Sequence, residues 1–134
     1  MPIRYLKIVL VVFVSLLCLL YATQNVVNLQ AAHGFVSAAL SMAEHVAYPA
    51  ALGPAITSSA LVWVALAVII LFEFAAGLLG CGAGIIVWFG FFTVIGGAYF
   101  QMWQTQLGSA SLQGSFQYTM MIGLVLLFLN QPDR

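Results

Sequence analysis

Long hydrophobic stretches occupy most of this chain and are separated by two more polar regions. A helix that rises about 1.5 Å per residue needs about 20 apolar residues to cross the hydrocarbon core of a bilayer. The stretches therefore predict an all-α fold, a bundle of four transmembrane helices in a single membrane domain over residues 1–134. We expect these helices at about residues 4–23, 59–79, 82–103 and 112–129.

The first hydrophobic stretch also has a feature of secretory signal peptides, because the basic residue Arg4 precedes it. Signal peptides end in small residues in an A-x-A-like arrangement, whereas this stretch ends in Leu20, Tyr21 and Ala22. We therefore expect it to remain in the protein as the first transmembrane helix.

Residues 60–100 are too long for a single crossing and are expected to supply the second and third helices. Glycine accepts left-handed backbone conformations that other residues resist, so the turn between these helices is expected in the glycine-rich segment 80–84. This connector contains no Lys or Arg, which is unusual for a loop at a membrane surface.

The polar regions, residues 24–58 and 104–111, are expected to form two extracytoplasmic loops. In the longer loop, Leu29, Val36 and Leu40 recur at a helical spacing. This spacing favours a short amphipathic helix that lies in the membrane interface.

The few basic residues favour an orientation with both termini in the cytoplasm. Arg4, Lys7 and Arg134 lie near the chain ends, and basic residues are enriched on the cytoplasmic side of membrane helices. Tryptophan and tyrosine prefer the interface between membrane and water. The aromatic residues that border the loops are therefore expected at that interface: Tyr21, Trp63, Tyr99, Trp103 and Tyr118.

Composition supports a membrane environment and excludes one class of partner. Hydrophobic residues make up 64% of the chain and charged residues only 4%, whereas soluble domains carry about 25% charged residues. The formal net charge is zero, so the chain has no basic surface to neutralise nucleic-acid phosphates. We expect the lipid bilayer as its surroundings and no nucleic-acid partner.

No pattern in the sequence indicates a catalytic, metal or cofactor site. The H-E-x-x-H, C-x-x-C, G-x-S-x-G and phosphate-loop motifs are all missing. On one helix, His33 and His45 would point about 120° apart, so we do not expect them to share a metal ion. The protein is expected not to be an enzyme and to bind no cofactor.

Glu73 is the most informative residue, because it is the one charge within the two central helices. It lies about 9 Å inside the end of its helix, and a carboxylate within a membrane is costly unless it is paired, neutralised or hydrated. Thr93, at the same level of the next helix, is its candidate hydrogen-bond partner. We favour a structural role between helices or subunits, with proton, ion or quinone chemistry and snorkelling as alternatives.

Several glycines are expected to let the helices pack closely, since small residues allow membrane helices to approach one another. Gly80 and Gly84 have the G-x-x-x-G spacing, although the turn explains them better. We favour packing over cofactor binding for the whole set: Gly77, Gly80, Gly84, Gly96 and Gly97.

Several short motifs together resemble those of a known family. They are RYLKI at residues 4–8, Tyr48 with Pro49, the segment 55–58, Glu73, and Gly96 and Gly97 before Met102, Trp103 and Gln104. Over nearly the whole chain they resemble the bacterial predicted small integral membrane proteins of domain-of-unknown-function family 2165. The resemblance implies a four-helix protein of the bacterial inner membrane and implies no activity.

The chain also departs from the pattern of that family. Members carry a longer, basic connector between the second and third helices, which is missing between Leu79 and Gly84 here. Members also carry an acidic and a basic residue at positions that resemble Ala98 and Gln117. A mechanism based on that charged pair would lack both charges in this chain.

Most features of the sequence serve helix packing. We therefore expect a non-catalytic accessory subunit that packs against other membrane protein subunits of a respiratory or transport complex. The alternative is a small transporter, or a quinone-linked or proton-linked redox protein, that uses Glu73. A third hypothesis is a homo-oligomer joined through the small-residue faces.

Overall fold

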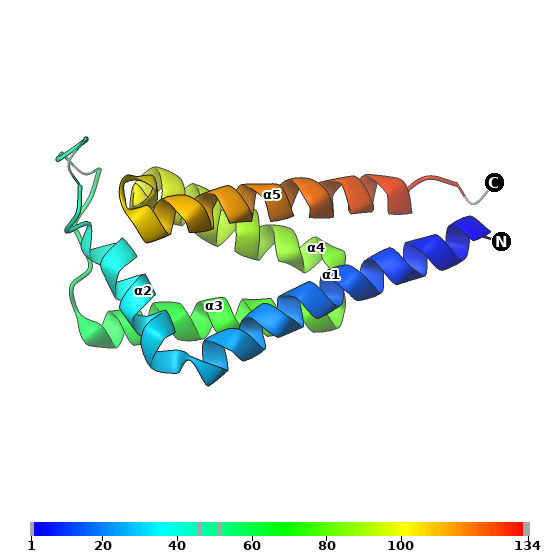
Figure 1. The fold of residues 1–134 in the computed structure, drawn as a ribbon, viewed down its shortest axis with the longest axis horizontal. Helices are drawn as coiled ribbons and strands as arrows, with labels where there is room; N and C mark the ends of the chain where they lie inside the picture. The colour runs from blue at the N-terminus through cyan, green and yellow to red at the C-terminus, as the bar shows by residue number, and fades with distance from the viewer. Residues whose placement is uncertain (1, 46, 51, 133–134) are drawn as a thin grey trace.

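The computed structural model describes residues 2–45, 47–50 and 52–132 (Figure 1). In this part of the chain the fold is all-helical and contains no β-strand. Element η1 is a π-helix and η2 is a short 3₁₀-helix. The elements in chain order are α1 (Pro2–Val27), α2 (Leu29–Ser41), α3 (Ser59–Leu79), α4 (Cys81–Ile85), η1 (Ile86–Tyr99), η2 (Met102–Gln104) and α5 (Gln106–Leu129).

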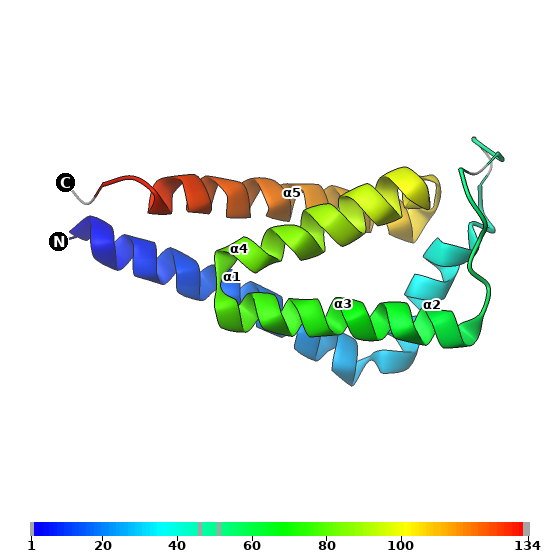
Figure 2. The ribbon, with the colours of Figure 1, turned by 180° about the vertical axis from the view of Figure 1, so that it is seen from behind.

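The described chain contains four helical segments that are long and apolar enough to cross a membrane, so the predicted all-α class and the four spans are confirmed. Both termini lie at one end of the bundle, and the loops after α2 and η1 lie at the other (Figures 1 and 2). At the terminal end, the Lys7 ammonium donates a hydrogen bond to the backbone carbonyl of Gln131. Arg134 lies outside the described residues. The four spans are Ile3–Val27, Ser59–Leu79, Gly82–Tyr99 and Gln106–Leu129.

Two helices extend beyond the limits expected from the sequence. The first helix continues past residue 23, where the Thr23 hydroxyl donates to the Leu19 carbonyl at 2.7 Å. The last helix begins before residue 112, because the Thr105 side-chain oxygen accepts the Gly108 N–H at 2.9 Å and caps the helix.

A single glycine makes the turn between α3 and α4. Gly80 has a φ of +92°, which residues with a Cβ rarely adopt, and it sends the chain directly into α4 (Figure 2). The third predicted helix, over 82–103, differs in form, since its main part is the π-helix η1. Hydrogen bonds there reach the fifth residue back, as from the Phe100 N–H to the Ile95 carbonyl at 3.0 Å.

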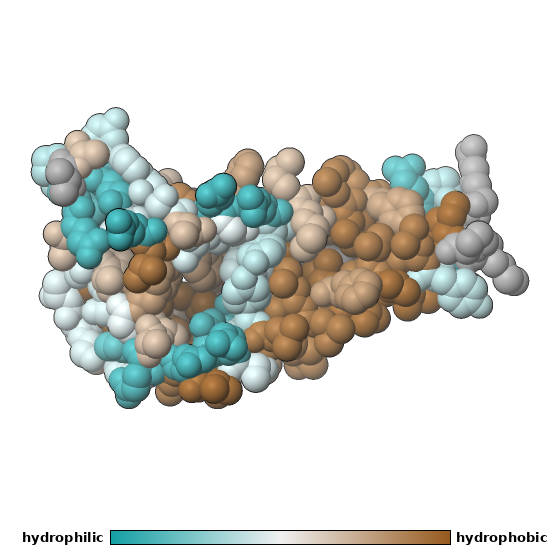
Figure 3. All heavy atoms as spheres, viewed as in Figure 1, coloured by the Kyte–Doolittle hydropathy of each residue, from teal (hydrophilic) through white to brown (hydrophobic). Residues whose placement is uncertain are grey.

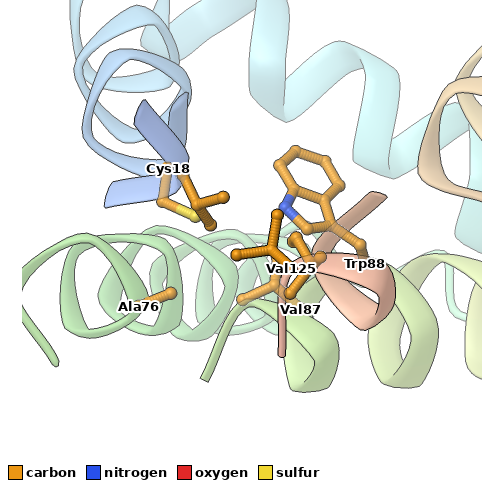
Figure 4. Packing of buried hydrophobic residues seen from close by; sticks show 7 residues of the cluster. Cys18, Ala76, Val87, Trp88 and Val125 are labelled. Atoms are coloured by element: carbon orange, nitrogen blue, oxygen red, sulfur yellow. The ribbon is translucent and has the colours of Figure 1, made fainter. Parts of the chain in front are cut away.

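Two clusters of buried hydrophobic side chains hold the helices together. The first joins α1, α3, η1 and α5, and Figure 4 shows five of its members pointing toward one another: Cys18, Ala76, Val87, Trp88 and Val125. The second cluster joins α2, α3 and the end of η1: Val36, Leu40, Met42, Val62, Leu66 and Phe100. The bundle is therefore packed at two levels along α3.

The helix α2 packs along the first half of α3, and the loop after it is fastened at both of its edges. The Ile56 N–H donates to the Leu40 carbonyl at 2.9 Å. The Gln104 side-chain oxygen accepts the N–H groups of Ala47 at 2.8 Å and Tyr48 at 3.1 Å. The two bonds to Gln104 fix the long loop to the segment that precedes α5.

Two of the glycines expected to aid packing lie where neighbouring helices come close together. A Cβ on Gly77 would lie 2.5 Å from Leu19 Cγ, and a Cβ on Gly97 would lie 2.8 Å from Leu112 Cδ1. Neither distance is possible for real carbon atoms in contact. The absence of a side chain at Gly77 therefore lets α1 approach α3, whereas only the end of the flexible Leu112 side chain lies close to Gly97.

The aromatic residues expected at the membrane interface lie in two different places. Trp63 and Trp103 contact α2 and the loop after it, and Tyr99 lies at the end of η1. These three residues belong to the loop end of the bundle. Tyr118 and Tyr21 instead face each other between α5 and α1, because their hydroxyl groups are hydrogen-bonded to each other.

Candidate functional site

Glu73 is buried within the bundle and is held by a residue of α1. Only 1% of its surface is exposed, and its Oε2 accepts a hydrogen bond from the side-chain amide of Asn25 at 2.8 Å. Such a bond offsets part of the cost of burying a polar group. A polar contact therefore joins α1 to α3 inside the bundle.

The side chain that reaches Glu73 is Asn25 and not Thr93, the partner expected from the sequence. The Thr93 hydroxyl donates instead to the backbone carbonyl of Trp88 at 3.0 Å. This bond follows the π-helical register of η1, in which a residue lies over the carbonyl five positions before it. The expected contact between α3 and η1 is thus replaced by a contact between α3 and α1.

Three aromatic rings from three helices line the same space as Glu73. The ring centre of Trp88 lies 4.8 Å from that of Tyr21 and 5.1 Å from that of Tyr118. The two tyrosine hydroxyls share a hydrogen bond of 2.5 Å. Within the described chain the buried indole N–H of Trp88 has no hydrogen-bond partner.

These residues surround a cavity of about 540 Å³, which is in the usual size range of small-molecule sites. Polar side chains from the end of α1 and the start of α5 line part of the wall: Gln24, Asn25, Asn28, Ser111 and Ser115. Figure 3 shows hydrophilic residues around the opening between the α1–α2 bend and the start of α5, whereas hydrophobic residues cover the half nearer the termini. The cavity therefore combines polar and aromatic walls.

Glu73 is the one charged side chain among the described residues that line this cavity. A buried carboxylate without a cationic partner is costly. The balancing positive charge must therefore come from a proton or from a bound cation. No group of three or more potential metal-ligating His, Cys, Asp or Glu side chains occurs in the part of the chain that the structure describes.

Sequence reasoning identified Glu73 but missed most of the residues around it. Tyr21, Gln24, Asn25 and Asn28 are spaced i, i+3, i+4 and i+7, so they share one face of a helix. This polar stripe was a usable signal. It was missed because the polar residues after position 23 were interpreted as the start of a loop.

Comparison with known protein families gives a match over nearly the whole chain. The sequence profile of the predicted small integral membrane proteins of domain-of-unknown-function family 2165 matches residues 3–83 and 77–132. The two matched segments overlap at 77–83, around the turn from α3 to α4. No curated protein and no solved structure matches the chain.

Proposed function

For this chain, which belongs to that family of predicted small integral membrane proteins, we propose a function from the chemistry of its cavity. The protein binds a small organic cation, with Glu73 as the counter-ion. The observation that carries the proposal is the buried Glu73 carboxyl in a cavity with no other charged side chain among its described lining residues. The proposed role is binding or transport, without a catalysed reaction.

Two properties of the cavity favour an organic cation over other ligands. A carboxylate attracts positive charge more strongly in a medium of low dielectric constant than in water, and aromatic faces such as that of Trp88 attract cations within about 6 Å. A metal ion fits less well, because metal sites require several oxygen, nitrogen or sulfur ligands around a small centre. A cavity of about 540 Å³ with aromatic walls suits a quaternary or protonated amine.

Binding of benzyltrimethylammonium to the purified protein in a neutral detergent tests this proposal. Replacement Glu73→Gln keeps the size of the side chain and removes its charge. We expect Glu73→Gln to weaken binding at least about tenfold, which corresponds to about 1.4 kcal/mol. Equilibrium dialysis with the radiolabelled cation gives the dissociation constant.

A matched control is available because the chain has a second glutamate. Glu44 is exposed in the segment after α2, so Glu44→Gln removes the same charge from outside the cavity and should leave binding unchanged. Gel filtration and the unfolding midpoint show whether each variant is folded. Equal binding by the wild-type and folded Glu73→Gln proteins would overturn the proposal.

We also propose that the protein lies in a bacterial cytoplasmic membrane with both termini in the cytoplasm. Arg4 and Lys7 at the start of α1 support this orientation, since basic residues are enriched on the cytoplasmic side. The polar wall formed by Gln24, Asn28 and Ser111 would then open toward the outer side of the membrane. In this orientation α2 lies at the outer surface.

A second candidate function is that of an accessory subunit in a larger membrane complex. The observation that favours it is the outward display of large apolar side chains: only 17–28% of the residues in the most apolar window of each spanning helix are buried within this chain. Other subunits could cover these faces as well as lipid does. Extraction from native membranes followed by mass spectrometry should then recover a stoichiometric partner, and migration of the protein alone would contradict this function.

A further inference from the structure

A second pocket adjoins the Glu73 cavity. It has a volume of about 270 Å³ and lies between α2, α3 and η1. Four side chains line both spaces: Phe35, Val36, Ile69 and Phe92. The polar cavity and the second pocket are therefore neighbours that share a wall.

The chemistry of the second pocket is that of a hydrocarbon site. The remaining side chains that line it are aliphatic, aromatic or thioether groups, among them Leu40, Ala65, Val68, Ile95 and Met102. An apolar cavity of about 150 Å³ lined by such residues stays dry and holds a benzene-sized apolar molecule. A pocket of about 270 Å³ therefore has room for a flexible hydrocarbon chain.

We propose that the ligand is a single-chain cationic amphiphile, with an ammonium head beside Glu73 and a hydrocarbon chain in the second pocket. This inference rests on the proposed function, because it specifies the ligand class of the same cavity. The shared wall of the two spaces and the charge of Glu73 together select this occupant. A molecule whose head is held at Glu73 can place its chain beside Phe35 and Phe92, which line both spaces, whereas a neutral lipid offers no positive charge to the carboxylate.

Photolabelling in a bilayer tests the position of the chain. The probe is a decyltrimethylammonium ion with a diazirine at the end of its chain, added to the wild-type protein in phosphatidylcholine nanodiscs. We expect adducts on buried pocket residues such as Leu40, Phe100 and Met102, mapped by peptide mass spectrometry. In the Glu73→Gln protein these adducts should fall several-fold, because the head is no longer held.

Two comparisons separate a specific site from general contact with lipid. A decanol analogue with the same diazirine lacks the positive charge and should label lipid-exposed residues such as Phe13 and Leu127, equally in both proteins. Ala65→Phe fills the pocket and should remove the chain adducts while benzyltrimethylammonium still binds. Ala67→Phe, an exposed position on the same helix, should change neither result.

The outcomes distinguish this inference from the proposed function. If benzyltrimethylammonium binds through Glu73 but the long-chain probe labels only lipid-exposed residues, the chain site is wrong and the cation site stands. If pocket adducts form equally with the decanol analogue or in Glu73→Gln, the pocket holds ordinary lipid and the inference is overturned. If neither cation binds, both proposals fail.

Discussion

Asn25 and Glu73, which are 48 residues apart in the chain, form a side-chain hydrogen bond of 2.8 Å between α1 and α3. Both residues line the cavity, together with the aromatic residues Tyr21, Trp88 and Tyr118. Asn25 therefore fixes the carboxyl group in place at the wall of the cavity.

Removal of Asn25 should destabilise the protein more than neutralisation of Glu73. Asn25→Ala leaves a buried carboxyl without its donor, which costs about 1–3 kcal/mol, whereas the amide oxygen in Glu73→Gln can still accept from Asn25. Chemical unfolding in detergent, followed by circular dichroism, gives the free energies.

Asn130→Ala is the control for this prediction. Asn130 is exposed after α5 and bonds to the backbone carbonyl of Leu126, so its replacement should have little effect on the free energy of unfolding. If Asn25→Ala and Asn130→Ala proved equally mild, the bond from Asn25 to Glu73 would not hold the bundle.

The number and placement of the spanning helices followed from the sequence because hydrophobic length is a strong constraint in a membrane. The second helix occupies Ser59–Leu79, the range expected from its apolar run and the glycines after it. The end of α1 was placed too early for a physical reason. Gln24 and Asn25 are polar because they face the cavity, and a polar residue in a helix cannot be distinguished from a loop residue by hydropathy alone.

Gly77 should be intolerant of any side chain, because it lies where α3 contacts α1. The Cβ in Gly77→Ala would lie 2.5 Å from Leu19 Cγ and 3.1 Å from the Ser15 carbonyl oxygen. The helices would have to separate, and overpacking of this kind costs about 1–3 kcal/mol. The unfolding midpoint in detergent should fall accordingly.

Gly123 provides the matched control for Gly77. A Cβ at Gly123 would meet nothing within 4 Å, so Gly123→Ala should leave stability unchanged or raise it slightly through better helix propensity. Equal effects of the two substitutions would show that α1 and α3 are not in close contact at Gly77.

The partner of Glu73 could not be found from spacing alone. The level of Thr93 was counted along a regular α-helix, but Thr93 belongs to the π-helix η1, where the position of each side chain around the axis is different. The polar stripe of α1 carried the missing information. The stripe identifies Asn25 as the partner only if α1 is known to lie beside Glu73. That placement depends on where α1 ends and the chain bends into α2.

Four crossings place the two ends of the chain on the opposite side of the membrane from the loop after α2. Single cysteines can report this in vesicles, in a background in which Cys81 is replaced by serine; Cys18 is buried. A membrane-impermeant maleimide should label Gln131→Cys and Ala50→Cys from opposite sides. Labelling of both from the same side would contradict the four-span topology.

The central claim, that the Glu73 carboxylate is the counter-ion of a bound organic cation, can be tested by NMR of that carboxyl group. The described chain contains two glutamates, Glu44 and Glu73, so selective ¹³C labelling of glutamate gives two carboxyl signals, and Glu73→Gln assigns them. Titration with benzyltrimethylammonium should shift the Glu73 signal saturably and leave the Glu44 signal in place. A Glu73 signal that stays fixed, or that moves only in parallel with that of Glu44, would contradict the account.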